Sequence, residues 1–117
     1  MHGFLNINEP EGMTSYDVIR KIKPLLPHKT KIGHLGTLDP MAGGVLPLAL
    51  GSATRVIPFI KNEDKTYLAT VTLGAVSDTL DAWGQVRYTD RVSFQEKDLR
   101  SILKEFTGNI KQLPPMY

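Results

Sequence analysis

The chain contains no cysteine among its 117 residues, so disulfide bonds and thiolate catalysis are excluded. This absence is compatible with the reducing cytosol, and we expect a cytoplasmic protein. No window approaches the roughly 18 consecutive apolar residues that a membrane-spanning helix needs. The first residues, 1–6, also lack the basic and apolar regions of a secretory signal. Together these absences predict a soluble protein without a targeting segment.

Several common catalytic signatures are also missing. The sequence has no Gly-x-x-x-x-Gly-Lys-[Ser/Thr] phosphate loop, and no dinucleotide-binding fingerprint follows a predicted strand. It has no Gly-x-Ser-x-Gly nucleophile elbow. Its three histidines, His2, His28 and His34, are too scattered for metal-ligand spacing. Nucleotide hydrolysis, dinucleotide redox chemistry, zinc hydrolysis and the commonest serine esterases are therefore disfavoured.

The formal net charge is small, only +2, but the basic residues are unevenly distributed. Between Val18 and Leu38 five of them occur without any carboxylate: Arg20, Lys21, Lys23, Lys29 and Lys31. Such a stretch can neutralise the phosphates of a nucleic acid. The same composition also suits an ordinary solvated helix face and loop.

Hydrophobic periodicity predicts an α+β sheet domain, because strands and helices are mixed without a regular βαβ repeat. Strands are predicted at 3–8, 45–50 (with Pro47 near a bulge or edge), 65–73 and 86–89. Helices are predicted from Thr14 or Ser15 to Pro24 or Pro27, from a cap at Ser52 to Ile60, and from a Ser93–Glu96 capping box to about Phe106 before Gly108. Residues 33–44 and 77–85 are predicted loops.

The loop 33–44 contains the main candidate for chemistry, Asp39. Its four glycines permit tight turns and let a bulky ligand approach the backbone. Pro40 restricts Asp39 to an extended conformation. A rigid, accessible carboxylate suits nucleophilic or general-base work at a sugar carbon. Asp-Pro is also a common turn initiator, which needs no catalysis.

Three further sites in the sequence each have both a functional and a structural interpretation. Tyr67, in the predicted strand 65–73, could stack on an extruded base and offer its hydroxyl, or simply pack half-buried. Asp78 and Asp81 could form a glycosidase-like pair with Asp39, or only organise a polar hairpin loop. His34 could wedge against a nucleotide, or form an ordinary surface hydrogen bond.

Taken in order and spacing, these segments resemble the TruB family of tRNA pseudouridine synthases. The most specific is Gly33 to Leu46 (Gly-His-Leu-Gly-Thr-Leu-Asp-Pro-Met-Ala-Gly-Gly-Val-Leu), which is similar to the catalytic-loop signature of that family. Four other segments resemble further family elements: Glu11 to Val18, Asp64 to Tyr67, Asp78 to Gly84 and Gln112 to Tyr117. The resemblance therefore covers essentially the whole chain.

The resemblance implies a partial pseudouridine synthase catalytic fold, an α+β domain with a mixed, largely antiparallel sheet and flanking helices. It also implies an enzyme that isomerises uridine 55 in the T arm of tRNA. The N-glycosidic bond is cleaved, the base rotates and it rejoins the ribose through C5, without cofactor or metal. Asp39 would be the catalytic carboxylate, and Tyr67 the tyrosine against the flipped base, whose extrusion costs about a few kcal/mol. The remaining residues assigned to RNA binding are His34, Gly36, Thr37, Asp81, Lys21, Lys29 and Lys31.

Two departures from the family pattern stand out. The family commonly has Lys-Pro where this chain has Glu9-Pro10, and a negative charge there is expected to weaken RNA contact or loop packing. The family domain also extends well past the position of Tyr117, with a strand whose basic residue pairs with the catalytic aspartate and usually a C-terminal RNA-binding module. We therefore expect residues 1–117 to be the N-terminal portion of a catalytic domain, monomeric when complete and inactive alone.

Three alternatives remain open at this point. A guide-RNA-dependent pseudouridine synthase subunit of archaea and eukaryotes shares the Thr-Leu-Asp-Pro loop, although residues 78–84 favour the bacterial stand-alone type. The chain could instead be a non-catalytic fragment that binds tRNA. A glycoside hydrolase is a distant third, because it needs a second carboxylate at a suitable distance from Asp39.

Overall fold

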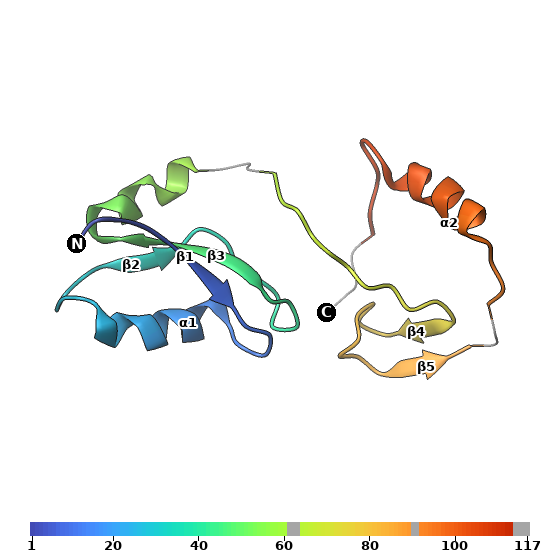
Figure 1. Ribbon diagram of the computed structural model, residues 1–117, viewed down its shortest axis with the longest axis horizontal. Coiled ribbons are helices and arrows are strands. Elements are labelled where there is room, and N and C mark those ends of the chain that lie inside the picture. Colours follow the sequence, from blue (N-terminus) through green and yellow to red (C-terminus); the bar gives the residue numbers. More distant parts are fainter. Residues whose placement is uncertain (61–63, 90–91, 114–117) are drawn as a thin grey trace. The chain divides into compact units, whose positions relative to one another are not determined.

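The computed structural model describes residues 1–60, 64–89 and 92–113 (Figure 1). The chain divides into two compact units, Met1–Thr66 and Tyr67–Tyr117. The first unit contains β1 (Gly3–Glu9), α1 (Ser15–Ile22), the 3-10 helix η1 (Lys23–Leu25), β2 (Ile32–His34), β3 (Gly44–Leu50) and the 3-10 helix η2 (Gly51–Phe59). The second contains β4 (Ala75–Ser77), β5 (Val86–Tyr88), α2 (Glu96–Leu103) and the 3-10 helix η3 (Lys104–Phe106). The predicted α+β class is confirmed.

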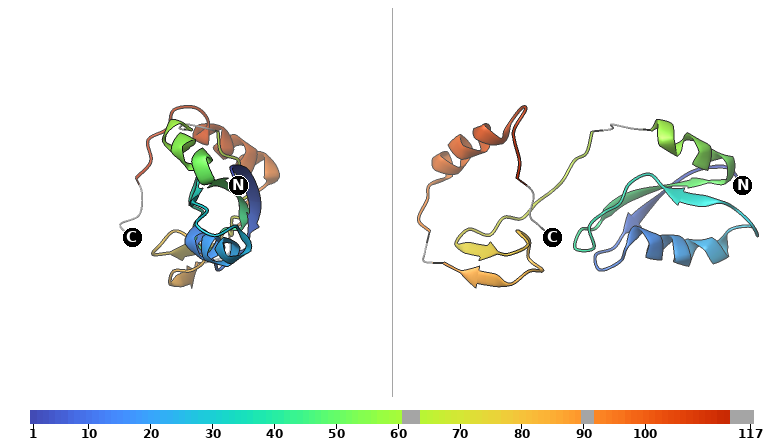
Figure 2. Two further views of the ribbon diagram at one scale, coloured as in Figure 1. Left: turned by 90° about the vertical axis from the view of Figure 1, so that its left-hand side faces the viewer. Right: turned by 180° about the vertical axis from the view of Figure 1, so that it is seen from behind.

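The first unit is a three-stranded antiparallel sheet of order β1-β3-β2 with a helix on each face (Figure 1 and Figure 2). On one face, Val18 and Ile19 of α1 pack against Leu46 and Leu48 of the central strand. On the other face lies η2, where a Cβ added to Gly33 would approach Ile57 Cδ1 to 2.9 Å. The Ile57 side chain of η2 therefore lies directly against the backbone of β2 at Gly33.

Local capping explains where α1 begins. The Thr14 hydroxyl accepts a hydrogen bond from the Asp17 amide (3.2 Å), and the Asp17 carboxylate accepts one from the Thr14 amide (3.0 Å). This reciprocal capping box satisfies two amides that have no partner within the helix. The helix then passes into η1, which contains Pro24 and ends before Pro27. Both the predicted cap and the predicted end of this helix are confirmed.

Pro47 lies where one side of β3 becomes a sheet edge. The pairing of β2 with β3 ends at His34 opposite Leu48, and the Leu35 amide donates a last hydrogen bond to the Pro47 carbonyl (2.9 Å). Proline has no N–H to return, so the ladder stops there. The prediction of an edge at Pro47 is confirmed. The predicted loop 33–44 is shorter than expected, because residues 33 and 34 belong to β2 and Gly44 to β3.

Two predicted helix caps are wrong. Ser52 lies inside η2, whose N-cap is Leu50, because the chain already turns at Gly51 with a φ of 60°. The α2 helix is capped at Gln95 rather than Ser93, because the Asp98 carboxylate accepts a hydrogen bond from the Gln95 amide (3.1 Å). The predicted end near Phe106 and the turn at Gly108, with a φ of 83°, are confirmed.

The predicted strand 65–73 is wrong. Residues 64–72 have no regular secondary structure, and Tyr67, Leu68 and Val71 are all exposed. A strand needs a neighbouring strand to bond with, and the only pairing described in this unit joins β4 to β5. The predicted strand 86–89 is confirmed as β5, and β4, which was not predicted, is its antiparallel partner.

Candidate functional site

Asp39 lies in the loop that joins β2 to β3, and its side chain is exposed. The Ala42 amide donates to the Asp39 backbone carbonyl (2.8 Å), which closes a turn over residues 39–42. The carboxylate itself has no hydrogen-bond or ion-pair partner among the residues that the structure describes. An exposed carboxylate without an internal partner is available to a ligand.

The backbone on both sides of Asp39 is tied to the segment between β1 and α1. The Leu38 amide donates a long hydrogen bond to the Ser15 hydroxyl (3.4 Å). The Gly12 amide donates a short one to the Pro40 carbonyl (2.7 Å). These two hydrogen bonds therefore fix the main chain on either side of Asp39, while its side chain stays exposed. Such an arrangement positions a reactive group.

His34 lies at the end of β2, half-buried, with its ring against the beginning of the same loop. Its Nδ1 hydrogen-bonds to the Gly36 carbonyl oxygen. A carbonyl can only accept, so Nδ1 carries the proton, and in the neutral ring Nε2 remains an acceptor. Thr37 is exposed beside them. The residues predicted around Asp39 are thus gathered on one short segment.

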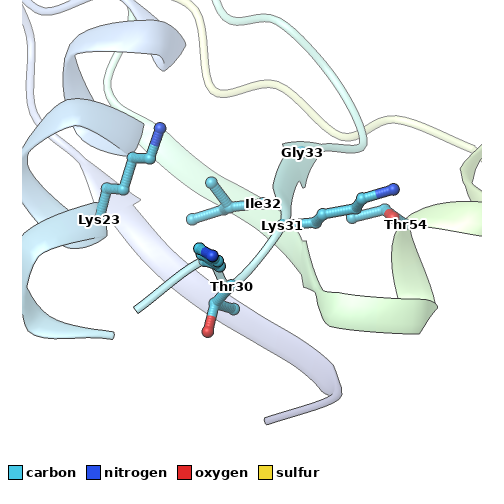
Figure 3. A pocket seen from close by; sticks show the side chains of 7 residues that line it. Lys23, Thr30, Lys31, Ile32, Gly33 and Thr54 are labelled. Atoms are coloured by element: carbon cyan, nitrogen blue, oxygen red, sulfur yellow. The ribbon is translucent and has the colours of Figure 1, made fainter. Parts of the chain in front are cut away.

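A cationic pocket lies between the end of α1 and the start of β2. Its volume is about 460 Å³, and Lys23, Lys29 and Lys31 line it together with Thr30, Ile32, Gly33 and Thr54 (Figure 3). Of the three lysines predicted to bind RNA, Lys29 and Lys31 line this pocket, whereas Lys21 is exposed on α1 and is not among its lining residues. Lys23 was overlooked as a site residue, although it belongs to the basic stretch of the sequence.

The cationic pocket and the Asp39 loop lie at opposite ends of the first sheet. Ile32, which lines the pocket, pairs with Leu50 at the end of β3, whereas the loop leads into Gly44 at its beginning. A seven-residue strand rises by roughly 3.3 Å per residue, so its ends lie about 20 Å apart. A polyanion that touched both regions would therefore be an extended molecule rather than a small one.

Tyr67 is the first residue of the second unit, and its side chain is 71% exposed within the irregular segment 64–72. The Asp81 carboxylate accepts hydrogen bonds from the Thr79 hydroxyl (2.8 Å), the Trp83 amide (2.8 Å) and the Gly84 amide (3.2 Å). Asp78 accepts one from the Gln85 amide (2.8 Å). Both carboxylates therefore organise the hairpin loop between β4 and β5, which was the structural interpretation of this loop.

The hydrogen bonds to Asp81 affect the pKa of its carboxyl group. Donation by the Thr79 hydroxyl, and then by the Trp83 amide, lowers the pKa of Asp81. The folded-state pKa of Asp81 therefore lies below the unfolded value of about 3.9. The ionised carboxylate contributes its full stabilisation of the folded state above that pH, and this contribution is lost as the pH falls through the folded pKa. In a carboxyl-carbon NMR titration we expect Thr79→Val to move the Asp81 midpoint upward. An unchanged midpoint would show that the hydroxyl is not the cause.

No helix in the described part of the chain is long and apolar enough to cross a membrane. Within residues 1–60, 64–89 and 92–113, no group of three or more His, Asp or Glu side chains is arranged to hold a metal ion.

Comparison with known proteins decides the family. The profile described as "TruB family pseudouridylate synthase (N terminal domain)" matches residues 23–117. This chain belongs to the TruB family. Its relatives include proteins named tRNA pseudouridine synthase B from Syntrophomonas wolfei subsp. wolfei (57% identical), Clostridium kluyveri (48%) and Clostridium acetobutylicum (44%). Each match covers 100% of this chain but only 39% or 40% of the relative, so the chain spans about two-fifths of the length of these TruB proteins.

Residues 1–22 lie outside the matched family profile, yet the relatives align with them over their full length. They include Glu9 and Ser15, the only two polar or charged residues that are buried in the described part of this TruB chain. The sequence predicts no site role for Ser15, and for Glu9 it predicts only an unfavourable charge. Their burial is the signal that distinguishes them, and a sequence alone does not give it.

Proposed function

We propose that this chain is the N-terminal part of an enzyme that converts uridine 55 in the T arm of tRNA to pseudouridine, with Asp39 as the catalytic carboxylate. The observation that carries the proposal is the Asp39 loop. Its backbone is held at both neighbouring residues, while the carboxylate stays exposed and has no partner among the described residues. The relatives named tRNA pseudouridine synthase B support the substrate class.

The proposed reaction is an isomerisation, so it needs a positioned acid–base or nucleophilic group rather than a group donor. The bond between N1 of uracil and C1′ of ribose breaks, a bond between C5 and C1′ forms, N1 gains a proton and C5 loses one. A carboxylate can attack a carbon or accept a proton, and an exposed one can reach an unstacked nucleotide. We assign Tyr67 the face of the extruded base and Asp81 a place near the RNA.

The whole enzyme is proposed to contain further parts besides these residues. Because the chain spans about two-fifths of its relatives, we assign the rest of the active site and a C-terminal RNA-binding module to the remaining three-fifths. We also propose that the complete enzyme is monomeric and acts in the cytoplasm. On this proposal the 117 residues alone do not turn over a T-arm stem-loop.

The test is to incubate the full-length product of this gene with a tRNA transcript that carries uridine 55, without guide RNA, and to map pseudouridine. Modification at position 55 is expected. A product that appears only when a guide RNA is added would favour the guide-dependent subunit. Binding of tRNA without any product would favour a non-catalytic binding protein.

The cationic pocket is proposed to hold phosphates of the same tRNA about 20 Å from the reacting base. Each lysine that contacts a phosphate releases about 0.9 counterion from a duplex, so Lys29→Gln and Lys31→Gln should each lower the slope of log K against log salt by about 0.9. We expect both to weaken tRNA binding, measured by filter binding over a range of salt concentrations.

Lys97→Gln provides the matched control, because it removes the same charge from an exposed position of α2, outside the pocket and outside the residues assigned to RNA. Its salt slope should stay close to that of the unmodified protein. If the three variants reduce the slope equally, binding follows the general charge of the chain, and the pocket is not a specific phosphate site.

A further inference from the structure

Glu9 is a buried acidic residue that the proposed reaction does not use. It is 0% exposed and is the last residue of β1, where it pairs with Gly44 at the start of β3. Glutamate is almost never fully buried unless it has a partner. Here the partner is the Ser15 hydroxyl, which donates to the Glu9 carboxylate at 3.0 Å and 3.3 Å from its two oxygens.

Ser15 connects this carboxylate to the Asp39 loop. Ser15 is 2% exposed, and a hydroxyl has one proton to donate and lone pairs with which to accept. Its proton is committed to Glu9, so its oxygen is oriented to accept the Leu38 amide (3.4 Å). Replacement of the acceptor would leave the hydroxyl free to rotate, and the Leu38 amide would then lose its fixed partner.

Leu38 is the residue directly before Asp39, and a second contact confirms that it lies over the Glu9–Gly44 pair. Its Cδ1 lies 3.6 Å from where a Cβ on Gly44 would be. The chain of contacts therefore runs from a buried carboxylate, through one hydroxyl, to the main chain next to the proposed catalytic residue.

We propose that Glu9 and Ser15 are positioning residues for Asp39, with Glu9 orienting the Ser15 hydroxyl and Ser15 holding the Leu38 amide. This inference rests on the proposed function of Asp39. It also gives Glu9 a role inside the protein, in place of the unfavourable contact with RNA that was expected from its charge. A displacement of about 1 Å at a reacting group can cost about 100-fold in rate.

The test measures pseudouridine formation by the full-length protein and, on the same samples, hydrogen exchange of peptides that contain Leu38. Ser15→Ala should lower kcat about 10- to 100-fold, leave KM for tRNA within about twofold, and accelerate exchange at Leu38. Glu9→Leu should act in the same direction. Glu9→Gln should retain most of the activity, because the amide oxygen can still accept the Ser15 proton.

Thr14→Ala is the control for a merely structural effect. Thr14 caps the same helix one residue earlier, so its loss destabilises α1, but no contact joins it to Leu38 in the described residues. Its kcat should be unchanged at a temperature where it is folded. Equal effects of Thr14→Ala and Ser15→Ala on kcat, or an unchanged kcat in Ser15→Ala, would overturn the inference.

Failure of the proposed function gives a different result. If the unmodified protein forms no pseudouridine, the proposed reaction is wrong, and the assignment of positioning residues falls with it. If the unmodified protein is active and only Asp39→Asn is inactive, the reaction stands and the roles of Glu9 and Ser15 are wrong.

Discussion

Asp39→Asn is expected to abolish pseudouridine formation while tRNA binding persists. Asparagine has nearly the same shape as aspartate, so the turn over residues 39–42, which uses the Asp39 backbone carbonyl, is retained. The amide carries no charge and can neither attack a carbon nor accept a proton. Loss of a general base typically costs about 10²- to 10⁴-fold, and loss of a nucleophile costs at least as much. Release of tritium from C5-labelled uridine measures the reaction directly.

The matched control is Asp98→Asn, which removes the same charge from the first turn of α2. Its carboxylate accepts the Gln95 amide and serves the helix alone, so kcat should be retained. Activity of Asp39→Asn within tenfold of the unmodified protein would refute the catalytic assignment. Loss of tRNA binding in Asp39→Asn would instead show that the carboxylate shapes the loop rather than acts in the chemistry.

The sequence predicts the loop that contains Asp39 because its signals are local. Glycines permit the turns, Pro40 restricts the residue before it, and the strand that follows is apolar. The Thr14 cap of α1 is predicted for the same reason, since it depends on residues at most three positions apart. What local signals cannot give is the pairing of Glu9 with Ser15 and of Ser15 with Leu38, because the last contact spans 23 positions.

The failure at 65–73 has a different physical origin. Alternation of apolar and polar residues records which face of a strand would be buried, but it does not supply the strand beside it. Tyr67, Leu68 and Val71 are exposed, and none of the described residues from 67 to 113 is buried. The basic stretch between Val18 and Leu38 illustrates a related point. Its composition does not reveal that Lys23, Lys29 and Lys31 line one pocket while Lys21 does not.

Leu48→Ala is expected to have the largest effect on stability. Leu48 is 0% exposed at the centre of the first sheet, and it packs with Val18, Ile19 and Leu46 in the buried cluster of that unit. Truncation of a buried leucine costs about 2–5 kcal/mol, through lost burial and the cavity left behind. Small domains are stable by only about 5–15 kcal/mol, so this single change should remove a large fraction of the free energy of unfolding. Urea unfolding followed by circular dichroism measures it.

Val45→Ala is the control for Leu48→Ala. It tests whether the loss of stability comes from the buried position of Leu48 rather than from the loss of methyl groups anywhere on β3. Val45 lies on the same strand, but its side chain is 66% exposed, so its truncation should cost less than about 1 kcal/mol. Equal losses for the two variants would mean that Leu48 does not lie in a packed core. A large loss for Leu48→Ala alone would show that the core formed with α1 stabilises β3, the strand that the Asp39 loop enters at Gly44.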